Sequence, residues 1–492
     1  MTAPPDVFAW LRGQADQEIE TSCARVFLLK DRALKVKKPV DFGFLDFTTL
    51  AKRRWALERE LAFNRATAPD IYRGLRSITR TGAEYAFDGP GEIVDYALEM
   101  RRFDPAAVLS ECPDRVDGTL AEALGRTIAR FHAAADVRPQ GGGVKALGYT
   151  IRTNAEHLMA LKDRLGADAV ARVVAATDAA LAQATPLLEA RRAEGFARRC
   201  HGDLHLGNIL LEGGQPRLFD CIEFNDLLSE IDVLYDVAFL IMDLSFRGRA
   251  DAANRAFNAY LDEAARSFPA SLWEGLAALP LMLSARASVR AHVTANQGED
   301  AEARAYLAAA EQHLAPPPAR LIAIGGVSGT GKTPRARLAA PRLSAAPGAV
   351  ILRTDEIRKR LAGVGPLDRL PPEAYDAAMG ERVYGEMQAI ARRTLAAGRS
   401  TVLDAVFLRA EERRGAEALA DELGAPFEGV WLQGSPELLR ARLAARTGDA
   451  SDADARVLAE QLDRDPGPID WRFADVADLN ATADDLVGET AS

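Results

Sequence analysis

Short apolar runs alternate with longer helix-like stretches in the last third of the chain. The runs are four residues long and comprise Leu321–Ile324, Ala349–Leu352, Ser400–Leu403 and Gly429–Leu432. Strands that are apolar along their whole length suit a sheet covered on both faces, and strands that alternate with helices are typical of a parallel sheet. The pattern therefore predicts an α/β domain built on a parallel sheet.

The earlier residues show another order of elements. We expect a short helix at Asp6–Arg12 and then a β-hairpin formed by Arg25–Lys30 and Ala33–Lys38. A longer helix is expected at Thr48–Thr67, and further strands at Glu84–Phe87 and Ile93–Phe103. From Leu120 to Leu314 the pattern is mainly helical, with two short strands expected near 200–224. This order predicts an α+β domain with a small β-rich lobe over about residues 1–103 and a helical lobe over about residues 104–315.

Three consecutive prolines separate the two patterns. Ala315–Ala319 follows an alanine-rich helical stretch, and prolines cannot continue a helix. An apolar strand pattern begins directly afterwards. We therefore expect two domains, at residues 1–315 and 320–492.

Composition narrows the classes of function. The 492 residues carry a formal net charge of −10, and the sequence pI is about 5.4, so a large basic surface for nucleic acid is not expected. Four scattered cysteines do not form a disulfide framework, and no Cys/His cluster predicts zinc. No apolar stretch reaches the roughly 20 residues that span a bilayer, and the N-terminus lacks the pattern of a signal peptide. A cytoplasmic protein without a membrane segment is expected, and the oligomeric state is not indicated.

Residues 326–333 fit the phosphate-binding pattern G-x-x-x-x-G-K-[ST]. Glycines let backbone N–H groups turn toward phosphate oxygens, and the following helix directs its positive end at the same anion. Lys332 would reach the β- and γ-phosphates, and the Thr333 hydroxyl would help to hold Mg²⁺. The residues expected to bind the nucleotide are Gly326, Ser328, Gly329, Thr330, Gly331, Lys332 and Thr333.

A second cluster of chemistry lies at His201–Asn208, which reads His-Gly-Asp-Leu-His-Leu-Gly-Asn. Asp203 and Asn208 are five residues apart and Asp220 follows, which is the layout of a kinase catalytic loop with a downstream metal-binding aspartate. Asp203 would orient or deprotonate an acceptor hydroxyl, and Asn208 and Asp220 would hold Mg²⁺ on ATP. The alternative is structural, with the two histidines a buried polar pair at a turn.

A lysine and a glutamate upstream would complete such a site. Lys35 and Lys37 lie on one face of an expected strand, and we favour Lys35 for contact with the α- and β-phosphates. Glu58 and Glu60 on the next helix are candidates for its ion pair, with Glu60 favoured. No G-x-G-x-x-G precedes Lys35, and Ile19–Ser22 takes its place.

The catalytic-loop pattern over about residues 20–300 resembles the aminoglycoside phosphotransferase-like kinases. The resemblance implies a protein-kinase-like α+β fold for the first domain, and this family often lacks the glycine loop. Both domains in this order resemble bacterial proteins described as bifunctional aminoglycoside phosphotransferase/ATP-binding proteins.

Residues 320–470 resemble small-molecule P-loop kinases such as gluconate kinase, chloramphenicol phosphotransferase and zeta-toxin-like enzymes. The resemblance implies that Asp355 faces the acceptor hydroxyl and that Arg358 holds the acceptor. The alternative is that Asp355 and Thr354 merely cap a helix. Asp404 at the end of the third strand suits a Walker-B-like acid on Mg²⁺. Leu438–Arg446 resembles the lid and carries Arg440, Arg442 and Arg446. Arg446 is our candidate for phosphate contact, although the sequence does not decide which of the three arginines enters the site.

The favoured hypothesis is an ATP-dependent phosphotransferase that acts on a small hydroxylated metabolite such as a sugar, with two ATP/Mg²⁺ sites. One alternative is that the first domain is a non-catalytic nucleotide- or ligand-binding module that regulates the P-loop kinase. A weaker alternative is a polynucleotide 5′-end kinase, against which the acidic pI argues.

Overall fold

The computed structural model describes residues 6–43, 45–445, 448–476 and 486. Contacts between residues divide the chain into two compact units. The first comprises Met1–Val116, Ala134–Thr150 and Gly195–Leu240, and the second comprises Asp117–Ala133, Ile151–Glu194 and Ile241–Ser492. The predicted division at 315–320 stays a prediction. Residues 316–320 are neither helix nor strand.

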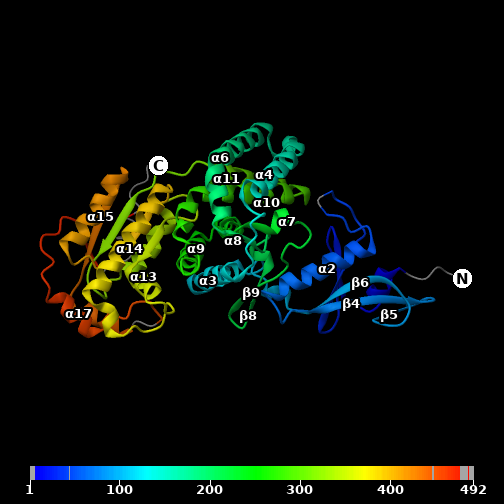
Figure 1. The fold of residues 1–492 in the computed structure, drawn as a ribbon, viewed down its shortest axis with the longest axis horizontal. Coiled ribbons are helices and arrows are strands. Elements are labelled where there is room, and N and C mark those ends of the chain that lie inside the picture. The colour runs from blue at the N-terminus through cyan, green and yellow to red at the C-terminus, as the bar shows by residue number, and fades with distance from the viewer. Residues whose placement is uncertain (1–5, 44, 446–447, 477–485, 487–492) are drawn as a thin grey trace. The chain divides into compact units, whose positions relative to one another are not determined.

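A six-stranded antiparallel sheet in the order β1-β2-β3-β6-β4-β5 forms much of the first unit (Figure 1). Its strands are β1 (Gln17–Glu20), β2 (Ala24–Leu28), β3 (Arg32–Lys37), β4 (Tyr72–Thr81), β5 (Glu84–Phe87) and β6 (Glu92–Arg101). The predicted hairpin is confirmed as β2 and β3, where Val26 pairs with Lys35. Strands β1 and β4 were not predicted. Two register shifts interrupt the pairing of β4 with β6, which removes the regular alternation that sequence analysis depends on.

Helix α2 (Leu50–Arg65) confirms the predicted long helix of the first unit. It begins after Thr49, whose side chain accepts a hydrogen bond from the Lys52 N–H and so satisfies one of the unpaired first-turn donors. Its buried Leu57 packs in one core with Ile71 and Leu98 of the sheet region. This packing directs the buried face of α2, which also carries Glu60, toward the sheet.

Four short strands follow in the first unit: β7 (Ala197–Arg199), β8 (Ile209–Glu212), β9 (Gln215–Leu218) and β10 (Glu230–Asp232). Strands β8 and β9 confirm the two strands predicted near 200–224, whereas β7 and β10 were not predicted. They pair as β8 with β9 and as β7 with β10, both antiparallel. The helices that lie wholly or partly in this unit are α1 (Val7–Arg12), α2, α4 (Gly143–Ala160), α7 (Asp226–Ser229) and α8 (Val233–Phe246).

A five-stranded parallel sheet in the order β12-β13-β11-β14-β15 lies in the second unit (Figure 1). Its strands are β11 (Leu321–Gly325), β12 (Val350–Arg353), β13 (Thr401–Asp404), β14 (Phe427–Gln433) and β15 (Arg472–Asp475). The first four confirm the predicted strands. The edge strand β15 was missed because it is mostly exposed and has no apolar run. Its core includes Ile322, Ile324, Val402 and Val430.

The second unit also contains most of the helices. They are α3 (Gly118–Ala134), α5 (Lys162–Leu165), α6 (Ala167–Ala193), α9 (Ala250–Ala264), α10 (Leu279–Asn296), α11 (Asp300–His313), α12 (Lys332–Ala339), α13 (Thr354–Leu361), α14 (Ala377–Ala396), α15 (Ala410–Leu423), α16 (Pro436–Ala445) and α17 (Ala455–Leu462). Among the described helices, none combines the length and the apolar character needed to cross a membrane.

Helix α9 satisfies the outer edge of strand β12 through a side-chain amide. The Asn258 carbonyl oxygen accepts a hydrogen bond from the Ile351 N–H at 2.7 Å, and its NH₂ group donates to the Ala349 carbonyl at 3.2 Å. An edge strand exposes unpaired N–H and C=O groups that invite pairing with other chains. Asn258 thus replaces part of a missing neighbouring strand.

Candidate active sites

The phosphate-binding loop lies between β11 and α12. Three of its glycines have positive φ: Gly326, Gly329 and Gly331. A Cβ at Gly326 would lie 2.6 Å from the carbonyl oxygen of Leu432, and one at Gly329 would lie 2.8 Å from that of Leu439. Both the backbone conformation and the close packing therefore require glycine in this loop.

A cavity of about 1590 Å³ opens beside this loop. Among the predicted site residues, those that line it are Ser328, Gly329, Gly331, Lys332, Thr333, Asp355, Arg358 and Asp404. Gly326 and Thr330 do not line it and instead shape the loop. Ligand pockets commonly measure about 300–1,000 Å³. The cavity therefore has room for a nucleotide and a small acceptor together.

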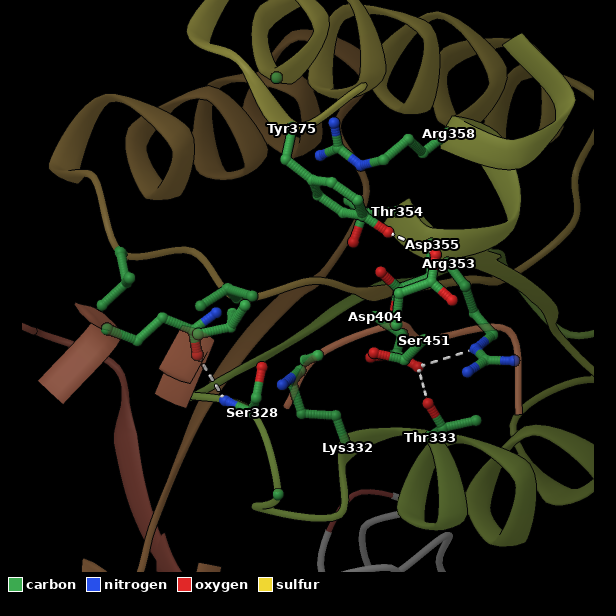
Figure 2. Close-up of a pocket in the computed structure, with 18 of the residues that line it drawn as sticks. Ser328, Lys332, Thr333, Arg353, Thr354, Asp355, Arg358, Tyr375, Asp404 and Ser451 are labelled. Carbon is green, nitrogen blue, oxygen red and sulfur yellow. Dashed lines mark hydrogen bonds and ion pairs between the residues drawn. The ribbon is translucent and has the colours of Figure 1, made fainter. Parts of the chain in front are cut away.

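Thr333 and Asp404 lie together at the loop side of the cavity (Figure 2). The Thr333 hydroxyl donates to Asp404 Oδ2 at 2.5 Å, and Arg353 Nε lies 3.4 Å from the same oxygen. Hydroxyl and carboxylate oxygens are hard ligands of the kind that Mg²⁺ prefers, so this donor pair fits a magnesium ion. Asp404 ends β13, which is the position predicted for it.

Arg353 is a central cation of the cavity wall that the sequence motif did not single out. Its side chain is 6% exposed and pairs with Glu356 at 3.0 Å and with Asp449 at 2.7 Å, besides Asp404. Burial alone would lower the pKa of Arg353, but these carboxylates raise it well above the ordinary value. A buried charged arginine thus joins β12, α13 and the segment around Asp449.

Asp355 and Arg358 lie on α13 at the side of the cavity opposite Lys332 (Figure 2). The Arg358 guanidinium stacks 4.9 Å above the Tyr375 ring and donates to the Ala374 carbonyl at 2.9 Å. The capping alternative for Asp355 is not supported, because α13 has Arg353 at its N-cap and no side chain caps it. Both side chains are therefore available to a ligand in the cavity.

Of the three predicted lid arginines, Arg442 lines the cavity. It donates to the Val476 carbonyl at 2.9 Å. Arg446 lies outside the described residues. Asp452, which follows the lid segment, is held by two side chains. Lys359 Nζ lies 3.2 Å from its Oδ1, and the Tyr375 hydroxyl donates to its Oδ2 at 2.7 Å.

Five charged side chains form a network in the first unit. Lys35 Nζ lies 2.7 Å from Glu60 and 2.8 Å from Asp220, and Lys37 Nζ lies 2.7 Å from Glu60 and 2.7 Å from Glu223. Glu60 thus pairs with both lysines. The ion pair with Glu60 therefore does not distinguish Lys35 from Lys37. Glu58 instead forms an exposed pair with Arg54.

Neighbouring charges favour the charged forms of Lys35, Lys37 and Asp220. Burial works against the charge of both lysines, but the neighbouring carboxylates raise the pKa of Lys35 and of Lys37. Burial likewise works against the Asp220 carboxylate, and Lys35 outweighs it, so the pKa of Asp220 is lowered. Asp220 also has a φ of 61°, a conformation rare for non-glycine residues and frequent at functional sites.

The predicted catalytic loop is held by a buried aspartate. Asp236 on α8 accepts hydrogen bonds from the backbone N–H groups of His201 at 3.0 Å and of Gly202 at 2.8 Å. Asn208 donates through its NH₂ group to Asp203 Oδ2 at 2.9 Å, which leaves its amide oxygen for another partner. The Asn208 amide oxygen and the Asp220 carboxylate are oxygen ligands of the kind that Mg²⁺ prefers, so they fit a magnesium–nucleotide complex.

The two histidines of the loop behave as structural residues. Burial lowers the pKa of His201, so its ring is neutral, and its Nε2 donates to the Phe219 carbonyl at 2.8 Å. His205 Nδ1 accepts the Gly207 N–H at 3.0 Å. The proton position on His201 follows from this hydrogen bond, since a carbonyl can only accept.

Strands β1 and β2 are joined by a tight turn where many kinases have a glycine loop. The Thr21 N–H donates to the Ala24 carbonyl at 2.9 Å, and the Ala24 N–H donates to Thr21 Oγ1 at 3.0 Å. Such a short turn offers few backbone N–H groups to a phosphate. Any triphosphate in this unit must therefore depend mainly on Lys35 and the metal-binding side chains.

Two residues that hold this candidate site together escaped the sequence analysis. Glu223 is buried and lies 186 positions from its partner Lys37, and Asp236 lies 35 positions from His201. Neither belongs to a local motif. An acid inside the apolar helix pattern at Asp236 was the available signal, because a buried charge requires a partner.

Comparison with known proteins assigns both parts of the chain. The Phosphotransferase enzyme family matches residues 56–279, and an AAA domain family matches residues 321–467. The uncharacterized protein Rv2004c of Mycobacterium tuberculosis is 32% identical over 469 residues, which cover 91% of this chain and 90% of that protein. A protein of Mycobacterium bovis matches equally well.

Solved kinase structures resemble the two parts separately. Choline kinase from Cryptosporidium parvum covers 63% of this chain and 94% of its own, with 10% identity and a TM-score of 0.42. A gluconokinase from Sinorhizobium meliloti covers 35% of this chain and 98% of its own, with 22% identity and a TM-score of 0.23. By its near full-length relatives and both domain matches, the chain belongs to the family of two-domain kinase-type phosphotransferases that join an aminoglycoside-phosphotransferase-like domain to a P-loop kinase-like domain.

Proposed function

We propose that the second domain transfers the γ-phosphoryl group of ATP to a hydroxyl group of a small metabolite such as a sugar. One observation carries this proposal: the phosphate-binding loop and the Asp355–Arg358 pair line one cavity with room for two ligands. In-line transfer needs donor and acceptor held together in one site, with water kept away.

Each residue would have a role that its position suits. Lys332 would contact the β- and γ-phosphates, and Thr333 with Asp404 would hold Mg²⁺, which neutralises phosphate charge when bound. Arg358, steadied by Tyr375, would orient the acceptor. Asp355 would accept a hydrogen bond from the attacking hydroxyl and take up its proton as the bond to phosphorus forms.

We also propose a second ATP/Mg²⁺ site in the first domain. Lys35, fixed by Glu60, would contact the phosphates, while Asn208 and Asp220 would hold Mg²⁺ and Asp203 would orient an acceptor hydroxyl. The charged network around Glu60 and the positive φ of Asp220 support this proposal.

The regulatory alternative has its own observation. The tight β1–β2 turn provides little backbone for phosphate binding, which favours a first domain that binds a ligand without chemistry and alters affinity at the P-loop. Such coupling is reciprocal, so a ligand of the first domain would change nucleotide affinity at the second, and the reverse.

The test measures ADP release and phosphorylated product with a panel of polyols, sugars and sugar acids. Lys332→Ala should abolish one activity, and Asp203→Asn should slow any activity of the first domain by about 10²- to 10⁴-fold, as for loss of a general base. Lys52→Ala and Asp16→Asn make the same changes at exposed ion pairs and serve as controls. If neither site variant changes turnover of any acceptor, the proposal fails.

A further inference from the structure

One peptide of the phosphate-binding loop is held from both ends. The carbonyl of Val327 accepts hydrogen bonds from Thr330 Oγ1 at 2.7 Å and from Lys332 Nζ at 3.2 Å. The N–H of the same peptide, on Ser328, donates to the side-chain oxygen of Gln461 at 2.7 Å (dashed at Ser328 in Figure 2). Gln461 lies 133 positions further along the chain, on helix α17.

This bond fixes which end of the Gln461 amide faces the loop. A backbone N–H can only donate, so the partner atom must be the amide oxygen and the NH₂ group must point elsewhere. Gln461 lines the cavity. Among the described residues, no acceptor is within hydrogen-bonding distance of its NH₂ group. Two N–H donors are therefore offered beside the loop.

Helix α17 holds Gln461 firmly in this position. Asp454 caps its N-terminus by accepting from the N–H groups of Arg456 and Val457, both at 3.0 Å. Leu458 is fully buried and anchors the helix. Val457 lies one turn before Gln461 and lines the same cavity. The sequence motifs gave no reason to select this glutamine.

We propose that Gln461 contacts the nucleotide, with its NH₂ group donating to an oxygen of the terminal phosphoryl group of a nucleoside triphosphate. The proposal rests on the proposed function and deepens it. Lys332 and Thr333 mark the β/γ end of the phosphate chain, and the Ser328 peptide held by Gln461 belongs to the same loop and lines the same cavity. A residue on the helix after the lid segment would then distinguish a triphosphate from a diphosphate.

The test compares binding of a non-hydrolysable ATP analogue and of ADP by calorimetry, with Mg²⁺. The full-length chain carries Asp220→Asn throughout, so that the first domain contributes little. Gln461→Leu removes both the acceptor and the donors. Gln461→Glu keeps an acceptor for the Ser328 N–H but loses the donors and adds a negative charge. Gln312→Leu changes an exposed glutamine of α11 and is the control.

Both Gln461 variants should bind the triphosphate analogue about 10- to 100-fold more weakly, as expected for loss of a hydrogen bond to a charged group. Affinity for ADP should change less than about threefold. An equal loss for both nucleotides would overturn the proposal and leave a loop-shaping role. Normal triphosphate binding by Gln461→Glu would also overturn it, as would tighter binding by Gln461→Leu. Lys332→Ala distinguishes failure of the Gln461 proposal from failure of the proposed function. Unchanged nucleotide binding by Lys332→Ala would refute the proposed function of the P-loop domain.

Discussion

Replacing Lys37 by methionine should destabilise the charged network that joins β3 and α2 to Asp220 and Glu223. The Lys37 side chain is 2% exposed and lies between Glu60, which is 0% exposed, and Glu223, which is 5% exposed. Methionine has a similar length and no charge. The substitution therefore leaves two buried carboxylates close together, with Lys35 as the remaining cation near them.

The size of the effect follows from this burial. Removal of one partner from a buried ion pair costs about 3–5 kcal/mol, because the other charge stays buried without compensation. Since about 1.36 kcal/mol corresponds to a factor of ten, local opening of β3 and α2 should become about 10²- to 10⁴-fold more frequent. By contrast, Lys38→Met at the next position removes a partly exposed pair with Glu20 and should cost at most about 1 kcal/mol.

The pH dependence gives a second check. Burial already raises the pKa of Glu223, and Lys37 is the main opposing influence. Without Lys37 this pKa rises further above its unfolded value. A carboxyl group whose pKa is raised in the folded state destabilises that state at pH values above the raised pKa. It has no effect on stability at pH values below the pKa of the unfolded chain, so the stability lost in Lys37→Met should shrink as the pH falls.

Hydrogen exchange read by mass spectrometry measures this local opening in the intact chain. Peptides from β3 and α2 should exchange faster in Lys37→Met, and less so at pH 5 than at pH 8 after correction for intrinsic rates. Equal exchange in Lys37→Met and Lys38→Met would refute the reasoning about the network, as would a larger loss at acid pH.

Two further substitutions test contacts that no motif announced. Asp236→Asn should weaken the hydrogen bonds to the His201 and Gly202 N–H groups and cost about 1.5–3 kcal/mol of stability. Hydrogen exchange should become faster in peptides spanning 199–209, and unchanged exchange there would contradict the anchoring role of Asp236. Asn258→Leu should leave the Ile351 N–H unpaired, cost about 1–3 kcal/mol and lower the thermal midpoint, whereas an unchanged midpoint would show that this contact does not protect the edge of the sheet.

Local patterns predicted the elements that carry regular burial. The first four strands of the parallel sheet, β11 to β14, are apolar runs, and the phosphate-binding loop follows β11. Strand β4 escaped because its bulges break the alternation, and β15 escaped because most of it is exposed. Burial on one or both faces is what makes a strand visible in sequence.

Site residues with distant partners were the harder part. Lys35 and Glu60 could be proposed because a known kinase layout links them. Glu223 and Gln461 could not, because their partners lie 186 and 133 positions away in the sequence. Their side chains match no local spacing rule. Only the folded chain brings Gln461 to the Ser328 N–H.

Calorimetric titration of the intact chain with a non-hydrolysable Mg²⁺–ATP analogue tests the central claim most directly. We expect two nucleotide sites, of which Lys332→Ala removes one and Asp220→Asn removes or weakens the other. A stoichiometry that Lys332→Ala leaves unchanged would contradict the claim that the P-loop cavity is a nucleotide site.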